Sequence, residues 1–450
     1  MFTIAFMQQI ITVYNFVLLP VYVFIFYLIV RKKSKKYEQM GLRKIFITAF
    51  WLRMAGAIGY SLLIQYYYGY GDTFGYYLGG NVLRDMIQHD ITSVKYLFAP
   101  AKDIVAAAKA IGFADAIPES MPNDSNVSVM KLSAILSYFT FNKYLLIAAC
   151  FGFFSFVGIW KLFYVFYQLN KKKNVKLLAF FVLYFPSLWF WGSGLLKEPL
   201  CVGALGIIIY LIYKNFIQKK FSIGDMIILL LMLYILTIIK NYITAILLVS
   251  ILVVLIYKLI GKIKHFVFRM IITFLLLLTT IITILTLDIS PYINSGIEIF
   301  FSRVQLMQTS YQQVNAENDK DNSTTFLLSD LTPTAESILI NSPEVIATTL
   351  FRPFVWEAKK IIILLAAIEA LLVLLLTLYI IIKTKFIWFF TYIFTDSVLL
   401  FCFIFSILFA LIIGFTTFNF GTLIRYKIIF LPFYFFLIVS IYSKYQNRHL

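Results

Sequence analysis

Charged residues interrupt the apolar sequence at five places, each time among aromatic residues, glycine or proline. They are Asp72, Lys197 with Glu198, Lys240, Arg352 with Glu357, and Arg425 with Lys427. Ionisable groups at the ends of long apolar runs are energetically costly, so they are usually paired or functional. A carboxylate can act as a general base, and lysine or arginine can hold a phosphate. These residue types therefore favour acid–base chemistry on an anionic substrate.

Asp72 lies in the segment 65–80, which is rich in tyrosine and glycine. The glycines beside it permit a sharp turn of the backbone. We expect Asp72 to lie where the chain leaves the membrane, as the candidate catalytic base. The structural alternative is an aromatic belt with one acid in a turn, because aspartate also favours turns.

Two further segments place lysine between apolar runs. Lys197 and Glu198 follow Gly192 and precede Pro199 in an expected tight hairpin, and Lys240 stands in a second expected hairpin with almost no loop. A lysine at such a position can simply anchor a helix end by extending to the lipid headgroups. Headgroup anchoring explains less well why a lysine and a glutamate stand next to each other at the end of a membrane span. We therefore take Glu198 as a second candidate catalytic group, and Lys197 and Lys240 as candidate phosphate ligands.

Two segments in the C-terminal half carry the remaining candidates. Arg352 and Glu357 lie on either side of Trp356, whose flat ring can stack on a sugar. Arg425 and Lys427 stand two residues apart before the last apolar run. Arginine binds phosphate with two parallel hydrogen bonds, so this pair resembles a phosphate clamp.

The elements that must position these residues are transmembrane helices. The sequence is 61% hydrophobic and 13% charged, with a mean hydropathy of +0.88, which excludes a soluble globular protein. Solid apolar runs predict helices rather than the alternating pattern of a membrane barrel. The predicted fold is all-α and polytopic, a single transmembrane domain over 1–450.

The eleven predicted spans are 10–30, 45–67, 143–169, 177–192, 198–213, 225–239, 243–260, 270–287, 361–382, 397–415 and 428–443. The aromatic stretch 386–395 is expected to form a helix in the membrane interface.

The distribution of lysine and arginine predicts the orientation. Six short connectors hold 22 of the 39 basic residues, whereas the long connectors 68–142 and 288–360 hold ten basic and sixteen acidic residues. The positive-inside rule then places the short connectors and the C-terminus in the cytoplasm. The N-terminus and the two long loops are expected outside. The net charge of +18 therefore belongs to loops near membrane lipids, and nucleic acid is not an expected partner.

Neither metal chemistry nor disulfides are indicated. Cys150, Cys201 and Cys402 all fall inside apolar runs, and the three histidines show no metal-ligand spacing. Asp72 is not part of a DxD motif. The expected mechanism uses no cofactor, although a divalent cation remains compatible with it.

These parts match displacement at the anomeric carbon of a sugar, with a lipid-linked phosphate as leaving group. The segment from Gly71 to Tyr76 resembles the GT-C class of membrane glycosyltransferases, in which such an aspartate is the expected base and polyprenyl-phosphate sugars are the donors. The segments 193–198, 352–357 and 421–427 are similar to bacterial membrane proteins of surface-polysaccharide assembly, including O-antigen and exopolysaccharide polymerases. The GT-C pattern has one span before the aspartate, whereas this sequence predicts two, so the polymerase remains an alternative.

The composition, rich in lysine, isoleucine, tyrosine and phenylalanine, is typical of bacterial proteins and predicts an inner-membrane protein with its site facing the periplasm. The resemblance implies that it is an enzyme. Its partners would be a lipid-linked sugar donor and a glycan acceptor. Two other classes of function stay open. A transporter or flippase for lipid-linked glycans is suggested by Glu369 inside an apolar run. A structural membrane protein would not need the charged residues to come together.

Overall fold

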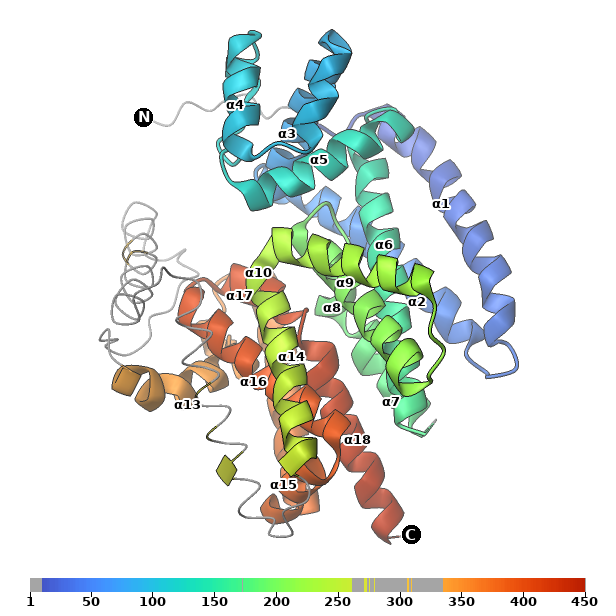
Figure 1. The fold of residues 1–450 in the computed structure, drawn as a ribbon, viewed down its shortest axis with the longest axis vertical. Helices are drawn as coiled ribbons and strands as arrows, with labels where there is room; N and C mark the ends of the chain where they lie inside the picture. Colours follow the sequence, from blue (N-terminus) through green and yellow to red (C-terminus); the bar gives the residue numbers. More distant parts are fainter. Residues whose placement is uncertain are drawn as a thin grey trace. The chain divides into compact units, whose positions relative to one another are not determined.

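The computed structural model describes residues 10–171, 173–260 and 335–449, together with isolated positions between 271 and 309. Every element within these ranges is a helix, as a chain that must satisfy its backbone polar groups within lipid requires (Figure 1). Seven described helices are long and apolar enough to cross a membrane. The predicted span 270–287 lies outside the described ranges. Two compact units are present, Met1–Leu169 with Val182–Asn241 and Asn170–Phe181 with Tyr242–Leu450.

The first unit is built around one central helix, α6 (Tyr144–Leu169). It packs against α1 (Val13–Ser34), α2 (Arg43–Leu63) and α9 (Lys197–Ile212). The contact of α6 with α9 is close, because a Cβ atom added at Gly158 would lie 2.2 Å from the carbonyl oxygen of Gly203. Small residues allow such close packing where lipid supplies no hydrophobic drive between helices. All four helices correspond to predicted spans.

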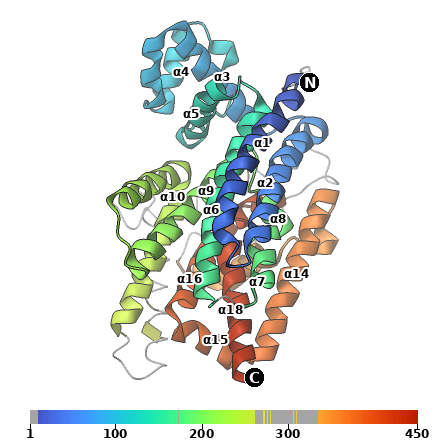
Figure 2. The ribbon, with the colours of Figure 1, turned by 90° about the vertical axis from the view of Figure 1, so that its right-hand side faces the viewer.

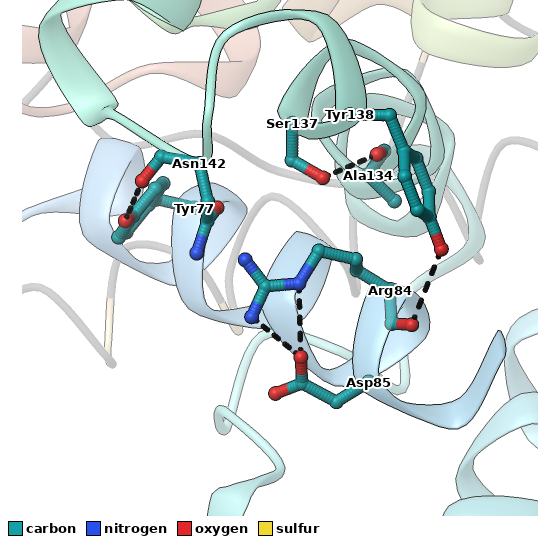
Figure 3. A network of polar contacts seen from close by, with 7 residues as sticks. All are labelled: Tyr77, Arg84, Asp85, Ala134, Ser137, Tyr138 and Asn142. Atoms are coloured by element: carbon teal, nitrogen blue, oxygen red, sulfur yellow. Dashed lines mark hydrogen bonds and ion pairs between the residues drawn. The ribbon is translucent and has the colours of Figure 1, made fainter. Parts of the chain in front are cut away.

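The predicted outer loop 68–142 is a folded helical cap. Its helices α3 (Asp72–His89), α4 (Ala101–Ala110) and α5 (Asp124–Phe139) lie beside one end of α1, α2 and α6 (Figures 1 and 2). The hydroxyl of Tyr77 donates to the carbonyl of Asn142 at 2.9 Å, and the hydroxyl of Tyr138 contacts the carbonyl of Arg84 at 3.4 Å (Figure 3). A tyrosine hydroxyl is neutral at physiological pH, and burial raises the pKa of Tyr77 further. The contact of Tyr138 joins α5 to α3, and the contact of Tyr77 joins α3 to the turn that follows α5.

The predicted span 177–192 is not one helix. The chain forms α7 (Val175–Ala179), a π-helical turn over Phe180–Tyr184, and then α8 (Pro186–Phe190). Phe185 has an extended backbone, with φ −61° and ψ 126°. Proline lacks an N–H group and restricts the residue before it to extended conformations, so Pro186 ends the first helix.

The predicted spans 225–239 and 243–260 both lie within α10 (Ile223–Ile260). This element consists of two helices that meet at a kink, where Lys240 has a non-helical backbone with φ −149° and ψ 84°. The break falls on the residue at which the sequence predicted a connection with almost no loop.

The second unit packs its apolar helices around α16 (Ser397–Thr416), which contacts α13 (Ala335–Phe351), α15 (Phe386–Thr395) and α18 (Leu431–His449). α14 (Ile361–Thr384) lies against α18 (Figure 2). α15 is a separate short helix, as predicted for 386–395. The predicted span 428–443 corresponds to α18, and the short helix α17 (Phe420–Lys427) before it forms a pair with α18 that is bent by 59°.

Part of the predicted outer loop 288–360 also belongs to the packed core of the second unit. The hydroxyl of Thr349 in α13 donates to the carbonyl of Ala410 in α16 at 2.8 Å, and both residues are buried. A polar side chain that satisfies a carbonyl of a neighbouring helix is a typical contact between membrane helices. The C-terminal part of this connector is therefore helix, not loop.

Candidate functional site

Asp72 is the first residue of α3, and two glycines place it there. α2 continues into a π-helical turn that ends at Gly69, which has φ 71°. Gly71 then adopts φ 157° and ψ 165°, a conformation essentially restricted to glycine, and α3 begins. The Asp72 side chain is exposed, and its charge is favoured by the N-terminal end of the helix dipole. The sharp turn expected beside Asp72 is confirmed.

Glu198 and Lys240 form a buried ion pair in the first unit. The Nζ atom of Lys240 lies 2.9 Å from Oε1 of Glu198, and the two side chains are only 6% and 1% exposed. Glu198 lies in the first turn of α9, and Lys240 lies at the non-helical position of α10. Two charges this deeply buried are tolerated because each neutralises the other. Neither residue is the isolated membrane anchor that was the alternative for Lys240.

Lys197 connects α9 to the helical cap. Its Nζ atom donates to the hydroxyl of Ser125 at 2.6 Å. Ser125 is held in turn by Asn123, whose side-chain oxygen accepts from the Ser125 backbone N–H at 3.0 Å and from its hydroxyl at 2.8 Å. Lys240, Glu198 and Asp72 all act electrostatically on the Lys197 ammonium group.

Lys197, Glu198 and Lys240 therefore come together in the first unit, and Asp72 lies within electrostatic range of Lys197. We call Asp72, Ser125, Lys197, Glu198 and Lys240 the Glu198 cluster. It combines two carboxylates, two ammonium groups and a hydroxyl at the junction of cap and membrane helices. Sequence reasoning did not identify Ser125, which stands in a polar segment without any distinguishing spacing.

A second cluster lies in the second unit and is organised by Arg352. Nε of Arg352 lies 3.0 and 3.2 Å from the two carboxylate oxygens of Glu357, and Nη2 also donates to Oε1. The same carboxylate accepts from the backbone N–H of Phe354 at 2.8 Å. Lys427 donates from Nζ to the carbonyl of Arg352. We call Arg352, Glu357 and Lys427 the Arg352 cluster.

Trp356 and Arg425 stand beside this cluster. Trp356 is 82% exposed, and its ring stacks on Phe354 with centroids 4.8 Å apart. The open face of this ring suits stacking on an apolar sugar face. Arg425 is half-buried in the last turn of α17, two residues before Lys427. Lys427 itself is buried and also feels the charge of Glu369 from α14.

One charged residue that sequence reasoning missed is Arg53. It lies near the middle of the candidate span Arg43–Tyr68, and its side chain is fully buried. At 1.5 Å per residue it stands about 15 Å from the start of α2, close to mid-membrane for a ~30 Å hydrocarbon core. Nη1 donates to the hydroxyl of Ser155 at 2.9 Å and to the carbonyl of Gly192 at 2.5 Å. Among the described residues, its Nε has no hydrogen-bond partner.

Arg53 holds the chain segment that leads to Lys197 and Glu198. Its contact with Gly192 requires glycine there, because a Cβ at that position would lie 2.2 Å from Nη1 of Arg53. The signal was present in the sequence, since Arg53 is the single charged residue between Lys44 and Asp72. An intramembrane charge is by itself a reason to expect a functional or organising role.

Within the described ranges, no group of three or more His, Cys, Asp or Glu side chains could hold a metal ion. Comparison of the chain with protein-family models, with curated proteins and with solved structures gave no match. The function is therefore inferred from the two clusters and from the chemistry of their side chains.

Proposed function

We propose that this protein is a membrane-embedded glycosyltransferase that uses a polyprenyl-phosphate-linked sugar or oligosaccharide as donor. It acts in the assembly of a bacterial surface polysaccharide, as a GT-C-like transferase or as a polymerase. The observation that carries this proposal is the Glu198 cluster, in which carboxylates and lysines meet at a membrane-helix end below a folded cap. A lipid-anchored donor reaches such a position from within the bilayer.

In the proposed reaction Asp72 accepts the proton of the attacking acceptor hydroxyl. The hydroxyl oxygen forms the new glycosidic bond as the bond between the anomeric carbon and the phosphate oxygen breaks. The departing polyprenyl phosphate carries the developing negative charge, and the Lys197 ammonium group stabilises it. The buried Glu198–Lys240 pair holds α9 and α10 in place around Lys197, and Glu198 supplies a second carboxylate.

The Arg352 cluster supplies a second set of groups with the same chemistry. Arg425 and Arg352 are guanidinium groups suited to phosphate, and Trp356 offers a ring face to a sugar. Lys427 is occupied by the carbonyl of Arg352, so its contribution is to fix Arg352 rather than to bind substrate directly. Phosphate binding by Arg352 and Arg425 and sugar stacking on Trp356 are part of the proposed glycosyltransferase function.

The proposed orientation places the cap, and with it Asp72, on the periplasmic side of the inner membrane. The support is the partition of lysine and arginine between connectors, which is a strong orientation signal for short loops. The proposed topology has eleven crossings, with the N-terminus outside and the C-terminus in the cytoplasm.

One observation favours a second candidate, a transporter or flippase for lipid-linked glycans. Glu369 in the apolar helix α14 acts electrostatically on Lys427, which ends the short helix of the bent pair α17–α18. Charged residues next to interrupted helices are typical of transporter substrate sites.

A deletion strain separates these functions. A transferase or polymerase predicts loss of a surface glycan, with the lipid-linked precursor accumulating on the periplasmic face. A flippase predicts the same loss with the precursor retained on the cytoplasmic face, measured by its accessibility to an impermeant glycosidase in intact cells. An unchanged glycan profile and precursor pool would contradict both functions.

A further inference from the structure

The turn between α1 and α2 contains a hollow that the proposed function does not use. Its volume is about 440 Å³, and it is lined by Glu38, Gly41, Arg43, Lys44, Ile47 and Thr48. Lys44 is exposed and Arg43 is half-buried, so both cations are accessible from the hollow. All these residues belong to the first unit and are separate from the Glu198 cluster.

The charge around this hollow is predominantly positive. Residues 31–44 contain seven lysines and arginines and one acid, Glu38. Nη1 of Arg43 lies 2.5 Å from Oε1 of Glu38, and the two side chains are 38% and 59% exposed. An exposed pair of this kind contributes little stability, so Arg43 can turn to a second anion at small cost. The hollow therefore favours a ligand with negative charge.

Aromatic packing and a backbone hydrogen bond hold the turn that forms the hollow. The ring of Tyr37 packs on Phe46 and Trp160, with centroids 5.0 and 4.9 Å apart. The backbone N–H of Leu42 donates to the carbonyl of Tyr37 at 3.0 Å. A preformed site loses less conformational entropy when a ligand binds.

The wall of the hollow continues as an apolar surface along α2. Arg43, Ile47 and Trp51 are spaced four residues apart and so lie on one face of the helix. Trp51 is 46% exposed, and its ring lies 5.5 Å from the ring of Tyr27 on α1. A ligand bound at Arg43 thus meets apolar and aromatic side chains in the direction of the membrane. This combination suits a molecule with an anionic head and an acyl chain.

We propose that the α1–α2 turn is a binding site for the headgroup of an anionic phospholipid. The phosphate lies between Arg43 and Lys44, and an acyl chain follows Ile47 and Trp51. The site binds a structural lipid and takes no part in glycosyl transfer. Clusters of cations next to a membrane helix attract anionic headgroups with about 1 kcal/mol per residue, so removal of two lysines or arginines should weaken binding by about tenfold or more.

The test is native mass spectrometry of the purified full-length protein titrated with phosphatidylglycerol and, separately, with phosphatidylcholine. The variant is Arg43→Gln/Lys44→Gln. The matched control is Lys219→Gln/Lys220→Gln, which removes the same charge from an exposed connector. We expect the first variant to lose phosphatidylglycerol binding by about tenfold or more and the control to retain it. Phosphatidylcholine binding should be weaker for the wild type and unchanged in both variants.

Equal losses in both variants would show a diffuse charge effect and overturn the site. Unchanged binding in the first variant would also overturn it. If the double substitution unfolds the protein, Lys44→Gln alone repeats the test at an exposed side chain. Displacement of the lipid by glycerol phosphate at equal concentration would identify a soluble phosphate as the ligand and overturn the lipid assignment.

Discussion

Lys240 and Glu198 lie 42 residues apart in the sequence, yet their charged atoms meet at 2.9 Å inside the first unit. The pair joins the start of α9 to the break in α10. Removal of Lys240 would take away the cation that lies 2.9 Å from the buried Glu198 carboxylate. The position of Lys197, the neighbour of Glu198, therefore depends on a contact with a helix far along the chain.

Breaking this pair from one side should be more damaging than removing both partners. Glu198→Gln or Lys240→Met alone leaves one buried charge, with an expected loss of about 3–5 kcal/mol. The double variant should lose less than the sum of the two, measured by thermal unfolding in detergent micelles. The partly exposed pair Lys214–Asp225 is the control, since Lys214→Met and Asp225→Asn should be nearly additive and mild. Additive losses at Glu198 and Lys240 would show that the pair is not energetically coupled.

Asp72→Asn tests the proposed base. Asparagine keeps the size and the turn preference of aspartate but cannot take up the proton, so glycan assembly should fall by about a hundredfold or more at normal protein levels. Asp103→Asn is the matched control, because Asp103 is also an exposed acid in the first turn of a cap helix, α4. The readout is surface glycan formed in a deletion strain that carries each variant. Full activity of Asp72→Asn would show that Asp72 is not the catalytic base.

Gly56→Ala tests the contact that supports the Arg53 site. A Cβ at Gly56 would lie 2.2 Å from the carbonyl oxygen of Trp189, so α2 must move away from α8. At Gly59, on the same helix, a Cβ would meet only a ring atom of Phe190 at 3.5 Å. Alanine favours helix by up to about 1 kcal/mol over glycine, so Gly59→Ala should be neutral or stabilising while Gly56→Ala lowers the unfolding temperature by several degrees. Equal behaviour of the two variants would refute the close packing of α2 on α8.

Cysteine labelling tests the proposed orientation. In a background with Cys150, Cys201 and Cys402 replaced, Ala114→Cys in the cap should react with an impermeant thiol reagent in intact cells. Lys36→Cys should react only after permeabilisation. Both side chains are exposed, whereas the nearby Ser34 is buried and would stay unlabelled on either side. Reversed labelling would place the cap in the cytoplasm and contradict the proposed periplasmic site.

Asp396 should make stability depend on pH. Burial alone raises the pKa of this carboxyl, but Lys444 at 2.6 Å and the backbone N–H groups of Val398 and Leu399 outweigh it, so the pKa is lowered overall. A lowered folded-state pKa contributes stability above about pH 4, and this is lost as the pH falls through the folded-state value. The unfolding temperature of the wild type should therefore fall between pH 5 and pH 3 more steeply than that of Asp396→Asn, which can still cap α16. Parallel pH profiles would contradict this.

Much of the fold was predictable because helices in lipid are determined locally. A long apolar run must satisfy its backbone hydrogen bonds within itself, so the spans over α1, α2, α6, α9, α14 and α16 could be read from hydropathy. Local signals also placed the glycine turn before Asp72 and the separate helix over 386–395. The helix break at Pro186 could not be predicted from hydropathy, because an apolar run has the same mean hydropathy whether or not a proline interrupts the helix.

Only the tertiary structure decided which polar groups meet. Nothing in the spacing of residues pairs Glu198 with Lys240, Lys197 with Ser125, or Arg53 with Gly192. Each contact joins segments far apart in sequence, and the contact of Arg53 with Gly192 also depends on the absence of a side chain at Gly192. A charged residue in an apolar run predicts that a partner of opposite charge or a hydrogen-bonding group lies nearby, because an unpaired charge is costly there. The partner is selected by packing, which acts over distances that a local pattern does not encode.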